Sequence, residues 1–189
     1  MKIHCITGLG NYDPRYDKTR HNVGFMFLDQ LIQHLNLSWK KHSTQSGLYC
    51  AWQHPKGKIL IFKPTKLMNI NGGPIVHFLH YHKIEPQNAL VAFDDLSFDP
   101  GTIKMKSKGG HGGHNGVRDI LAHLPDQNFY RLKFGIGRPT EKNSVSQYVL
   151  SAPNANDSEN IQKTIAYTIE NIDNIIDGQL INWQNQNPL

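Results

Sequence analysis

The spacing of hydrophobic and polar residues along the 189-residue chain predicts an alternation of strands and helices. Short apolar or alternating runs bounded by turn residues are typical of β-strands. They predict strands near 2–8, 47–54, 58–63, 88–94, 102–107 and 129–136. Apolar residues that recur every three or four positions are typical of amphipathic helices. They predict helices at about 23–36, 73–83, 115–124 and 158–182.

The last of these helices has the clearest pattern. Its apolar positions fall on one face, and they are Ile161, Ile165, Ile169, Ile172, Ile176 and Leu180. Asp157 and Ser158 are residue types that cap a helix N-terminus. We therefore expect one amphipathic helix over about 158–182, preceded by a loop at 151–157.

The alternation of strands and helices favours an α/β fold. We expect a single-domain sandwich over residues 1–189, with a mixed twisted β-sheet flanked by helices on both faces. No repeat, low-complexity tract or long linker divides the chain.

Several features argue for a cytoplasmic protein. No run approaches the roughly 18–20 apolar residues that span a bilayer, and the first ten residues look like a strand rather than a signal peptide. The two cysteines, Cys5 and Cys50, are too few for a disulfide framework and are not spaced as a metal knuckle. We expect no membrane contact.

The charge of the chain is unevenly distributed. Residues 157–189 hold one Lys and five acidic residues, whereas residues 1–156 hold 19 Lys and Arg against 10 Asp and Glu, a net charge of +9. Such an excess favours an anionic partner, and nucleic acid first.

Polar residues gather where expected strands end or expected helices begin, which is where α/β sheets bind ligands. There are four such places along the chain. They are Gly8–Asn11 with Thr19–Asn22, Lys63–Asn69 followed by Asn71, Phe93–Asp95, and the loop Gly109–Gly116 preceded by Lys104 and Lys106. A dinucleotide fingerprint is excluded at the first place, because Asp13 stands where a third glycine is needed.

The loop Gly-Gly-His-Gly-Gly-His-Asn-Gly at 109–116 is the most informative segment. Five glycines in eight positions indicate a backbone that bends sharply or approaches a ligand closely. Exposed N–H groups that lead into a helix also suit an anion. A flexible linker is the alternative, but linkers use Ser and Gly rather than paired His and Asn.

Candidate residues for catalysis include histidines, aspartates and asparagines but no evident nucleophile. There is no Gly-x-Ser-x-Gly elbow, and neither cysteine lies in an activating sequence context. A neutral imidazole can instead remove a proton from water, and a carboxylate can orient it. Asparagine amides can hold the water, a peptide backbone or an oxyanion. A metal-dependent nuclease or phosphatase that uses His111, His114 and Asp94 or Asp95 is an alternative, and activity in EDTA would exclude it.

These segments resemble one family throughout, the bacterial-type peptidyl-tRNA hydrolases. The resemblance covers nearly the whole chain. It rests on Gly8–Asn11, Tyr16, Thr19–Phe25, Met68–Asn69, Asp94–Leu96, Gly109–Gly116, Gly135–Pro139 and Tyr148–Leu150, in the family's order and approximate spacing. The Thr-Arg-His-Asn-x-Gly motif and the glycine loop are the most specific parts.

The resemblance implies hydrolysis of the ester that joins a peptide to the terminal ribose of tRNA, which recycles the tRNA. His21 matches the family's catalytic base, and Asp94 matches the aspartate paired with it. Asn11 matches a residue that positions the 3′ end of the substrate. Asn69 and Asn115 match asparagines that hold the peptide main chain and the hydrolytic water.

The resemblance also implies the rest of the substrate site and the partner. The expected substrate-binding residues are Tyr16, Met68, Asn71, His114, Gly112 and Gly113. Lys104, Lys106 and Lys133 are expected to bind tRNA phosphates. The partner is peptidyl-tRNA, through its CCA end and acceptor arm, and we expect no cofactor, no metal and a monomer.

Several positions depart from the family's pattern. Lys108 replaces the first of three glycines, Phe93 stands where His commonly precedes the aspartate, and Ser97 stands where Asp is usual. Lys66 and Leu67 replace Thr and an aromatic residue, and Lys133 replaces a frequent Arg. A non-catalytic RNA-binding module on the same scaffold is therefore the alternative function.

Overall fold

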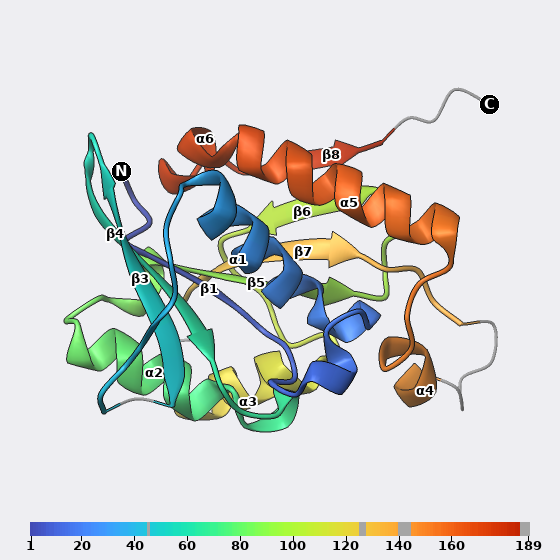
Figure 1. Ribbon diagram of the computed structural model, residues 1–189, viewed down its shortest axis with the longest axis horizontal. Helices are drawn as coiled ribbons and strands as arrows, with labels where there is room; N and C mark the ends of the chain where they lie inside the picture. The colour runs from blue at the N-terminus through green and yellow to red at the C-terminus, as the bar shows by residue number, and fades with distance from the viewer. Residues whose placement is uncertain (45, 125–127, 140–144, 186–189) are drawn as a thin grey trace.

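One mixed sheet of eight strands organises the computed structural model, which describes residues 1–44, 46–124, 128–139 and 145–185 (Figure 1). The strand order across the sheet is β2-β3-β4-β1-β5-β7-β6-β8. The strands are β1 Cys5–Gly8, β2 Lys40–Lys41, β3 Gly47–His54, β4 Gly57–Pro64, β5 Ala89–Asp95, β6 Thr102–Lys106, β7 Tyr130–Gly135 and β8 Asn182–Gln184.

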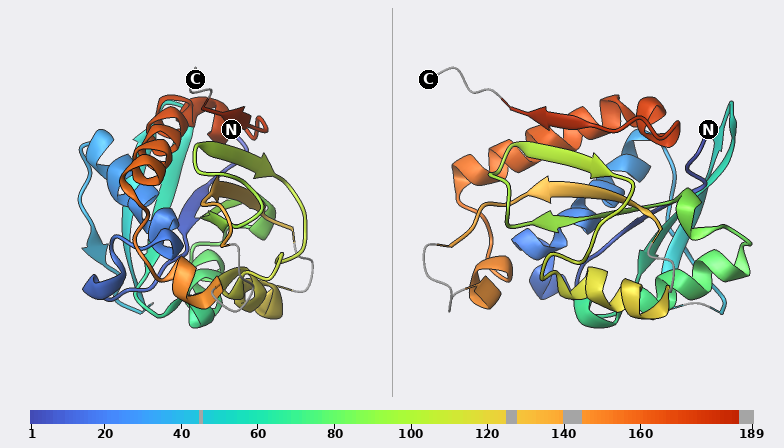
Figure 2. Two further views of the ribbon diagram at one scale, coloured as in Figure 1. Left: turned by 90° about the vertical axis from the view of Figure 1, so that its right-hand side faces the viewer. Right: turned by 180° about the vertical axis from the view of Figure 1, so that it is seen from behind.

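Helices cover both faces of this sheet (Figures 1 and 2). The helices α1, α5 and α6 pack on one face, and α2 and α3 pack on the other. The α-helices are α1 Val23–His34, α2 Gly72–Tyr81, α3 Asn115–His123, α4 Val145–Val149, α5 Ala155–Glu170 and α6 Ile172–Ile176. Short 3₁₀ helices are η1 Pro14–Tyr16, η2 Arg20–Asn22, η3 Met68–Ile70 and η4 Pro86–Asn88. The expected α/β sandwich with a mixed sheet is confirmed.

The strand directions bring four strand ends together. β1 is parallel to β4 and β5, and β5 is parallel to β7, while β2, β3, β6 and β8 pair antiparallel at the two sides. The carboxyl ends of β1, β4, β5 and β7 therefore lie at one edge of the sheet. The polar segments that follow or terminate β1, β4 and β5 meet there.

The central strand β5 is buried on both faces, which explains its almost continuous apolar sequence. Leu90 and Ala92 belong to the core under α1 and α5, whereas Val91 and Phe93 belong to the core under α2 and α3. The penultimate residue of the strand is Asp94, which is itself only 3% exposed. An ionisable group is thus placed within the buried part of the strand, one residue before its end.

Gly24 allows α1 to approach the sheet closely. A Cβ at this position would lie 2.4 Å from the carbonyl oxygen of Ala92 and 2.7 Å from that of Leu9. Both contacts are with backbone, so a side chain could be accommodated only by moving the helix or the strands. The start of α1, immediately after His21 and Asn22, is thereby held against β1 and β5.

The prediction of a single C-terminal helix at 158–182 is wrong, because the structure has two helices, α5 and α6, in this region. Helix α5 begins three residues earlier, capped by Asn154, whose Oδ1 accepts from the N–H of Asp157 at 2.8 Å. It ends at Glu170, and Asn171 has φ −102° and ψ 18° before α6 begins. The apolar period continues through the break because Ile172 and Ile176 remain in the same core. Leu180, by contrast, is 60% exposed.

Other expected elements agree with the structure to within a few residues. The strand expected at 2–8 begins only at Cys5, and the helix expected at 23–36 ends at His34, close to Asn36, whose φ is 54°. The short strands β2 and β8 and the helix α4 were not expected. Among the described residues, no helix is both long enough and apolar enough to cross a membrane.

Candidate active site

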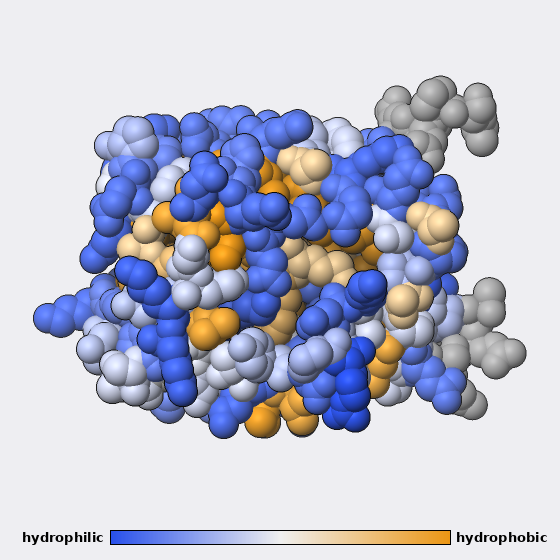
Figure 3. Space-filling model, in the orientation of Figure 1, coloured by the Kyte–Doolittle hydropathy of each residue, from blue (hydrophilic) through white to orange (hydrophobic). Residues whose placement is uncertain are grey.

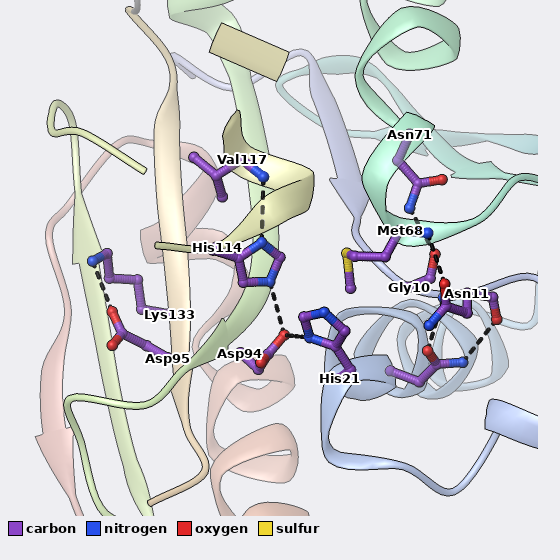
Figure 4. A network of polar contacts seen from close by, with 11 residues as sticks. Gly10, Asn11, His21, Met68, Asn71, Asp94, Asp95, His114, Val117 and Lys133 are labelled. Atoms are coloured by element: carbon purple, nitrogen blue, oxygen red, sulfur yellow. Dashed lines mark hydrogen bonds and ion pairs between the residues drawn. The ribbon is translucent and has the colours of Figure 1, made fainter. Parts of the chain in front are cut away.

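Two histidines share one carboxylate oxygen at the carboxyl end of β5 (Figure 4). The Nδ1 atom of His21 lies 2.8 Å from Oδ1 of Asp94, and the Nε2 atom of His114 lies 2.9 Å from the same oxygen. His21 comes from η2, directly before α1, and His114 is the N-cap of α3. Three segments distant in the sequence thus converge on one oxygen.

The hydrogen bonds indicate the tautomer of both rings. Nδ1 of His114 accepts from the backbone N–H of Val117 at 3.3 Å, so Nε2 of His114 carries the proton that it donates to Asp94. Nδ1 of His21 likewise donates to the ionised Asp94. In neutral His21 the other nitrogen, Nε2, therefore has a free lone pair and is a candidate proton acceptor.

The site also separates the pKa values of the acid and the base. Burial opposes ionisation of Asp94, but the charge of His21 and hydrogen bonds from both histidines hold its pKa well below the usual range. Burial likewise lowers the pKa of His21, yet the charge and hydrogen bond of Asp94 outweigh it and raise that pKa above its ordinary value. A buried carboxylate that stays ionised next to a more basic histidine suits general-base catalysis.

Asn11 is held from two sides next to this pair. Its backbone N–H donates to Oδ1 of Asn22 at 2.8 Å, and Nδ2 of Asn22 donates back to the Asn11 carbonyl at 3.0 Å. The side-chain oxygen of Asn11 accepts from the N–H of Met68 at 2.7 Å, which ties the loop to η3. Within the described part of the chain, Nδ2 of Asn11 has no protein partner, so its two N–H groups are available to a ligand.

Asn22 has a role that sequence reasoning did not assign. It is 1% exposed, and both polar atoms of its amide bond Asn11. The Thr-Arg-His-Asn-x-Gly motif contained this residue, but nothing in the spacing showed that it would bond a backbone eleven residues earlier.

Asn71 is more deeply buried than we expected of a substrate-binding residue. The sequence placed it among the substrate-binding residues, but it is fully buried, and its Nδ2 donates to the carbonyl of Gly10 at 2.6 Å. Nδ2 of Asn71 thus contacts the protein, while its buried Oδ1 has no hydrogen-bond partner among the described residues. Asn71 therefore positions the loop after β1 from the opposite side to Asn22.

The remaining expected substrate residues lie on η1, η3 and α3 and differ in their exposure. Asn69 is exposed on η3, Met68 beside it is only 3% exposed, and Tyr16 is half-buried at the end of η1. Asn115 is exposed at the first position of α3, where its Oδ1 accepts from Arg118 at 3.1 Å.

The glycine loop combines left-handed backbone with empty surroundings. Gly112 and Gly113 have φ of 56° and 85°, and no atom lies within 4 Å of a Cβ built on either. His111 braces the loop, since its Nδ1 accepts from the N–H of Gly113 at 3.0 Å. The loop thus leaves accessible backbone next to His114, in a conformation that favours glycine.

A group of basic residues lies on one face of the neighbouring strands β6 and β7. Lys104 stands opposite Lys133, and Lys106 stands opposite Arg131, so all four side chains project from the same face. Like charges directly opposite each other destabilise a sheet, which favours a functional reason for the arrangement. The sequence analysis did not single out Arg131, although it alternates with apolar residues along β7 in the same way as Lys133.

The structure separates these basic residues into two kinds. Lys106 is exposed, and Lys104 is half-buried with its Nζ 4.3 Å from the ring centre of Phe98. Lys133 instead pairs with Asp95 at 2.8 Å, and this contact, against the cost of burial, lowers the pKa of Asp95. Arg131 is fully buried and donates to the Phe129 carbonyl at 2.9 Å.

The site also contains the one metal-like cluster among the described residues. His21, Asp94 and His114 place potential ligand atoms within 4.8 Å of one another. However, both histidine nitrogens that face Asp94 act as hydrogen-bond donors, so the three groups satisfy one another without a metal. His111, which the sequence offered as a ligand, is not part of the cluster.

The fold and this site together are those expected of a hydrolase that uses an activated water molecule. A buried His–Asp pair with an uncommitted imidazole nitrogen suits the activation of water, and a basic face nearby suits an anionic substrate. Comparisons with known proteins identify the class more closely.

A family model described as peptidyl-tRNA hydrolase matches residues 5–187. A peptidyl-tRNA hydrolase of Acinetobacter baylyi is 40% identical over 185 residues, which cover 98% of this chain and 95% of that protein. The one from Dichelobacter nodosus is 41% identical over 187 residues, covering 96% of this chain and 97% of that protein. The crystal structure of peptidyl-tRNA hydrolase from Acinetobacter baumannii matches with a TM-score of 0.89 and 36% identity, covering 94% of this chain and 90% of that one. The chain belongs to the peptidyl-tRNA hydrolase family.

Proposed function

We propose that this protein hydrolyses peptidyl-tRNA at the ester between the C-terminal carbonyl of the peptide and the 3′-terminal ribose, and so recycles the tRNA. The observation that carries this proposal is the His21–Asp94 hydrogen bond of 2.8 Å, which leaves Nε2 of His21 free to accept a proton. Family membership supports the identity of the substrate.

In the proposed reaction, water is the nucleophile. Nε2 of His21 takes one proton as the water oxygen bonds to the ester carbonyl carbon, and Asp94 stabilises the imidazolium that forms. The tetrahedral intermediate then breaks its bond to the ribose oxygen, which receives the proton from His21. Such a general base contributes roughly 10²–10⁴-fold to the rate.

The amides around His21 are assigned to the substrate. The free Nδ2 of Asn11 can donate to the 3′ end of the tRNA, while Asn69 and Asn115 can hold the peptide main chain and the attacking water. Met68 supports this arrangement because its backbone N–H donates to the side-chain oxygen of Asn11. The N–H of Gly112 adds a donor that no side chain obstructs, whereas the N–H of Gly113 is bonded to His111 and leaves Gly113 to offer an open backbone surface. Tyr16 is assigned to pack against the terminal nucleotide.

Lys104 and Lys106 are assigned to tRNA phosphates, with Lys133 as a further contact once it leaves Asp95. Phosphate contacts carry little sequence information, so they suit an enzyme that serves many tRNAs. The reaction as proposed needs no metal and no cofactor, and we place it in the cytoplasm, where translation supplies the substrate. We expect a monomer.

The direct test is the release of a labelled N-acetyl-aminoacyl group from tRNA in the presence of EDTA. We expect the wild type and His34→Ala, an exposed histidine at the end of α1, to release the label, and His21→Ala to release almost none. Release by His21→Ala at the wild-type rate would overturn the role of His21. Binding of tRNA without release by the wild type would favour the RNA-binding module, and loss of activity in EDTA would favour a metal at His21, Asp94 and His114.

A further inference from the structure

Arg20, the residue immediately before His21, is buried against the segment that follows α4. It is 7% exposed, and its Nη1 donates to Oγ of Ser151 at 2.8 Å and to the carbonyl of Ala152 at 3.0 Å. Its backbone N–H also donates to the carbonyl of Ser151, at 3.1 Å. The 3₁₀ turn η2, which contains His21, is thus joined through both side chain and backbone to a residue 131 positions later in the chain.

The guanidinium group of Arg20 also stacks on Tyr148 of α4. Its Cζ lies 4.0 Å from the centre of the Tyr148 ring, and Figure 1 shows α4 beside the turns that precede α1. A planar guanidinium can lie on an aromatic ring while its N–H groups donate to carbonyl oxygens around the edge, whereas the ammonium group of lysine has no such plane. The contact therefore suits arginine rather than any cation.

Tyr148 connects this contact to the strand that carries Asp94. Its hydroxyl donates to the carbonyl of Ile136 at 2.6 Å, and the N–H of Ile136 donates to the carbonyl of Asp95 at 3.2 Å. Asp95 follows Asp94 in β5. The turn η2 and strand β5 are therefore held together twice. They are joined by the hydrogen bond between the proposed base and its carboxylate, and again through Arg20, Tyr148 and Ile136.

Stability alone does not explain why Arg20 is buried. Oδ2 of Asp157, its carboxylate partner, lies 3.7 Å from Nη2 of Arg20, which is too long for a hydrogen bond. The Nε–H group of Arg20 is buried without a hydrogen-bond partner among the described residues. An unpaired buried donor is destabilising, and a buried ion pair is weak evidence of stabilisation. The contacts of Arg20 therefore favour a geometric role.

A pocket of about 470 Å³ opens beside Arg20. It lies between α1 and the start of α5, and Val23, Met26, Ala152 and Ile161 form its apolar wall. Figure 3 shows hydrophobic surface exposed between α1 and α5 on this face of the molecule. A solute of the size of guanidinium can therefore reach the position of the Arg20 side chain from solvent.

We infer that Arg20 is a positioning residue for His21. The inference rests on the proposed function, because it concerns the step in which His21 takes a proton from water. By fixing η2 against α4, Arg20 holds the imidazole where Nε2 meets the water, whereas Asp94 sets the proton affinity of the ring. A displacement of a reacting group by about 1 Å can reduce the rate about 100-fold, even though the substrate still binds.

The test separates kcat from KM in the release of a labelled N-acetyl-aminoacyl group from tRNA. For Arg20→Ala we expect kcat to fall about 10–100-fold with little change in KM, because the groups assigned to the substrate remain in place. Arg20→Lys keeps the charge but loses the planar stack, so its kcat should fall by nearly as much. Tyr148→Phe keeps the ring and loses only the bond to Ile136, and we expect a fall in kcat of about fivefold.

Guanidinium supplies the group that Arg20→Ala lacks. We expect millimolar guanidinium chloride to raise the kcat of Arg20→Ala several-fold in a saturable way, and to leave His21→Ala inactive. Methylammonium chloride at the same concentration carries the charge without the plane, and it also corrects for the effect of salt on tRNA binding. It should not restore activity. A residue with a merely structural role would lower Tm without this response in kcat.

Two controls separate positioning from general effects. Lys163→Ala removes an exposed cation on α5 that pairs with Glu159, and it should keep the wild-type kcat. The slope of log K for tRNA against log salt should be the same for Arg20→Ala and the wild type, because a buried guanidinium releases no counterions from phosphates. Thermal unfolding verifies that each variant is folded at the assay temperature.

The possible results are distinguishable. Wild-type kcat in Arg20→Ala and Arg20→Lys would overturn the positioning role and leave the hydrolase intact. A rise in KM at unchanged kcat, or a salt slope smaller by about one, would make Arg20 a substrate contact instead. Equal restoration by guanidinium and methylammonium would contradict the need for a planar group. If Arg20→Ala does not fold, unchanged kcat in Arg20→Lys and Tyr148→Phe would overturn the inference. Failure of the wild type to release the label would overturn the proposed function, and the positioning role with it.

Discussion

The backbone N–H of Val117 donates to Nδ1 of His114 and thereby determines which ring atom of His114 meets Asp94. Because Nδ1 is an acceptor, Nε2 must be the donor. Asp94 consequently receives two N–H groups on one oxygen, one from His114 and one from His21. The basicity of His21 therefore depends on a helix cap on the other side of the carboxylate.

Replacing His114 with Ala removes one of the two donors to Asp94. The carboxylate charge is then less satisfied and interacts more strongly with protonated His21, so we expect the pKa of His21 to rise. The proposed reaction needs neutral His21, so the acidic limb of the pH–kcat/KM profile should move to higher pH, by up to about 0.7 unit for a bond worth about 1 kcal/mol. Profiles of both proteins from pH 5 to 9 provide the measurement, and an unchanged limb would contradict the coupling.

Asp94→Asn should move the same limb in the opposite direction. Without the carboxylate, burial is the main remaining influence on His21, and it lowers the pKa. The plateau rate should fall roughly 10²–10⁴-fold, because the imidazolium that forms during the reaction loses its partner. The measurement is kcat against pH, with folding verified by thermal unfolding. A limb at higher pH than in the wild type would be inconsistent with this account.

Gly24→Ala should destabilise the fold. The new Cβ would meet the carbonyl oxygens of Ala92 and Leu9 well inside contact distance, and we expect a loss of about 1–3 kcal/mol in the free energy of unfolding. Gly110→Ala is the matched control, since no atom lies within 4 Å of its Cβ and its φ is not left-handed. Urea unfolding of both variants gives the comparison, and equal stabilities would contradict the close packing of α1.

The basic face should respond unequally to loss of its lysines. Lys106→Ala should weaken tRNA binding and reduce the slope of log K against log salt by about one, as expected for one lost phosphate contact. Lys133→Ala should have a smaller effect, because a phosphate must first displace Asp95 from Lys133. Asp95→Asn should free Lys133 and tighten binding. Salt titrations of the three variants test this order, and weaker binding by Asp95→Asn would contradict it.

Acid should destabilise the protein through two histidines remote from the site. Burial lowers the pKa of His42 and of His82. The positive charges of His42 and Lys58 lower the pKa of His82 further. A folded pKa below the unfolded value means that the unfolded state binds more protons, so stability falls as the pH drops below about 6.5. His42→Phe, in a cluster that already holds Tyr49, should lose less Tm between pH 7.5 and pH 5.5 than the wild type. An equal loss would exclude His42 as a source.

The sequence was sufficient to predict most strands of the sheet, because the central strands are short, apolar and bounded by turn residues. Segments whose ends depend on tertiary contacts were harder. The period of isoleucines continued through Asn171, since both α5 and α6 face one core, and no local signal distinguished a bent pair of helices from a straight one. Strand β8 is three residues long and exists because β6 offers an edge to pair with.

The site shows the same difference between what local sequence signals predict and what tertiary contacts decide. Motif residues predicted which side chains gather, but not which of them remain accessible. Asn69 and Asn71 look alike in the sequence, yet one is exposed and the other fully buried against Gly10. Lys133 and Lys104 have similar sequence contexts, but in the structure the ammonium group of Lys133 pairs with Asp95 of β5. These differences arise from neighbours that are far away in the chain.

The reciprocal hydrogen bonds between Asn11 and the side chain of Asn22 repeat the pattern by which two antiparallel strands pair, with one side-chain amide in place of the second strand. Only a residue with both a donor and an acceptor on a short side chain can do this, so an aspartate at 22 would leave the Asn11 carbonyl without its donor. Since His21 is adjacent to Asn22, the loop to which we assign the tRNA end and the proposed base are held in place by the same pair of hydrogen bonds. Loss of the Asn22 amide would therefore loosen the support of both at once.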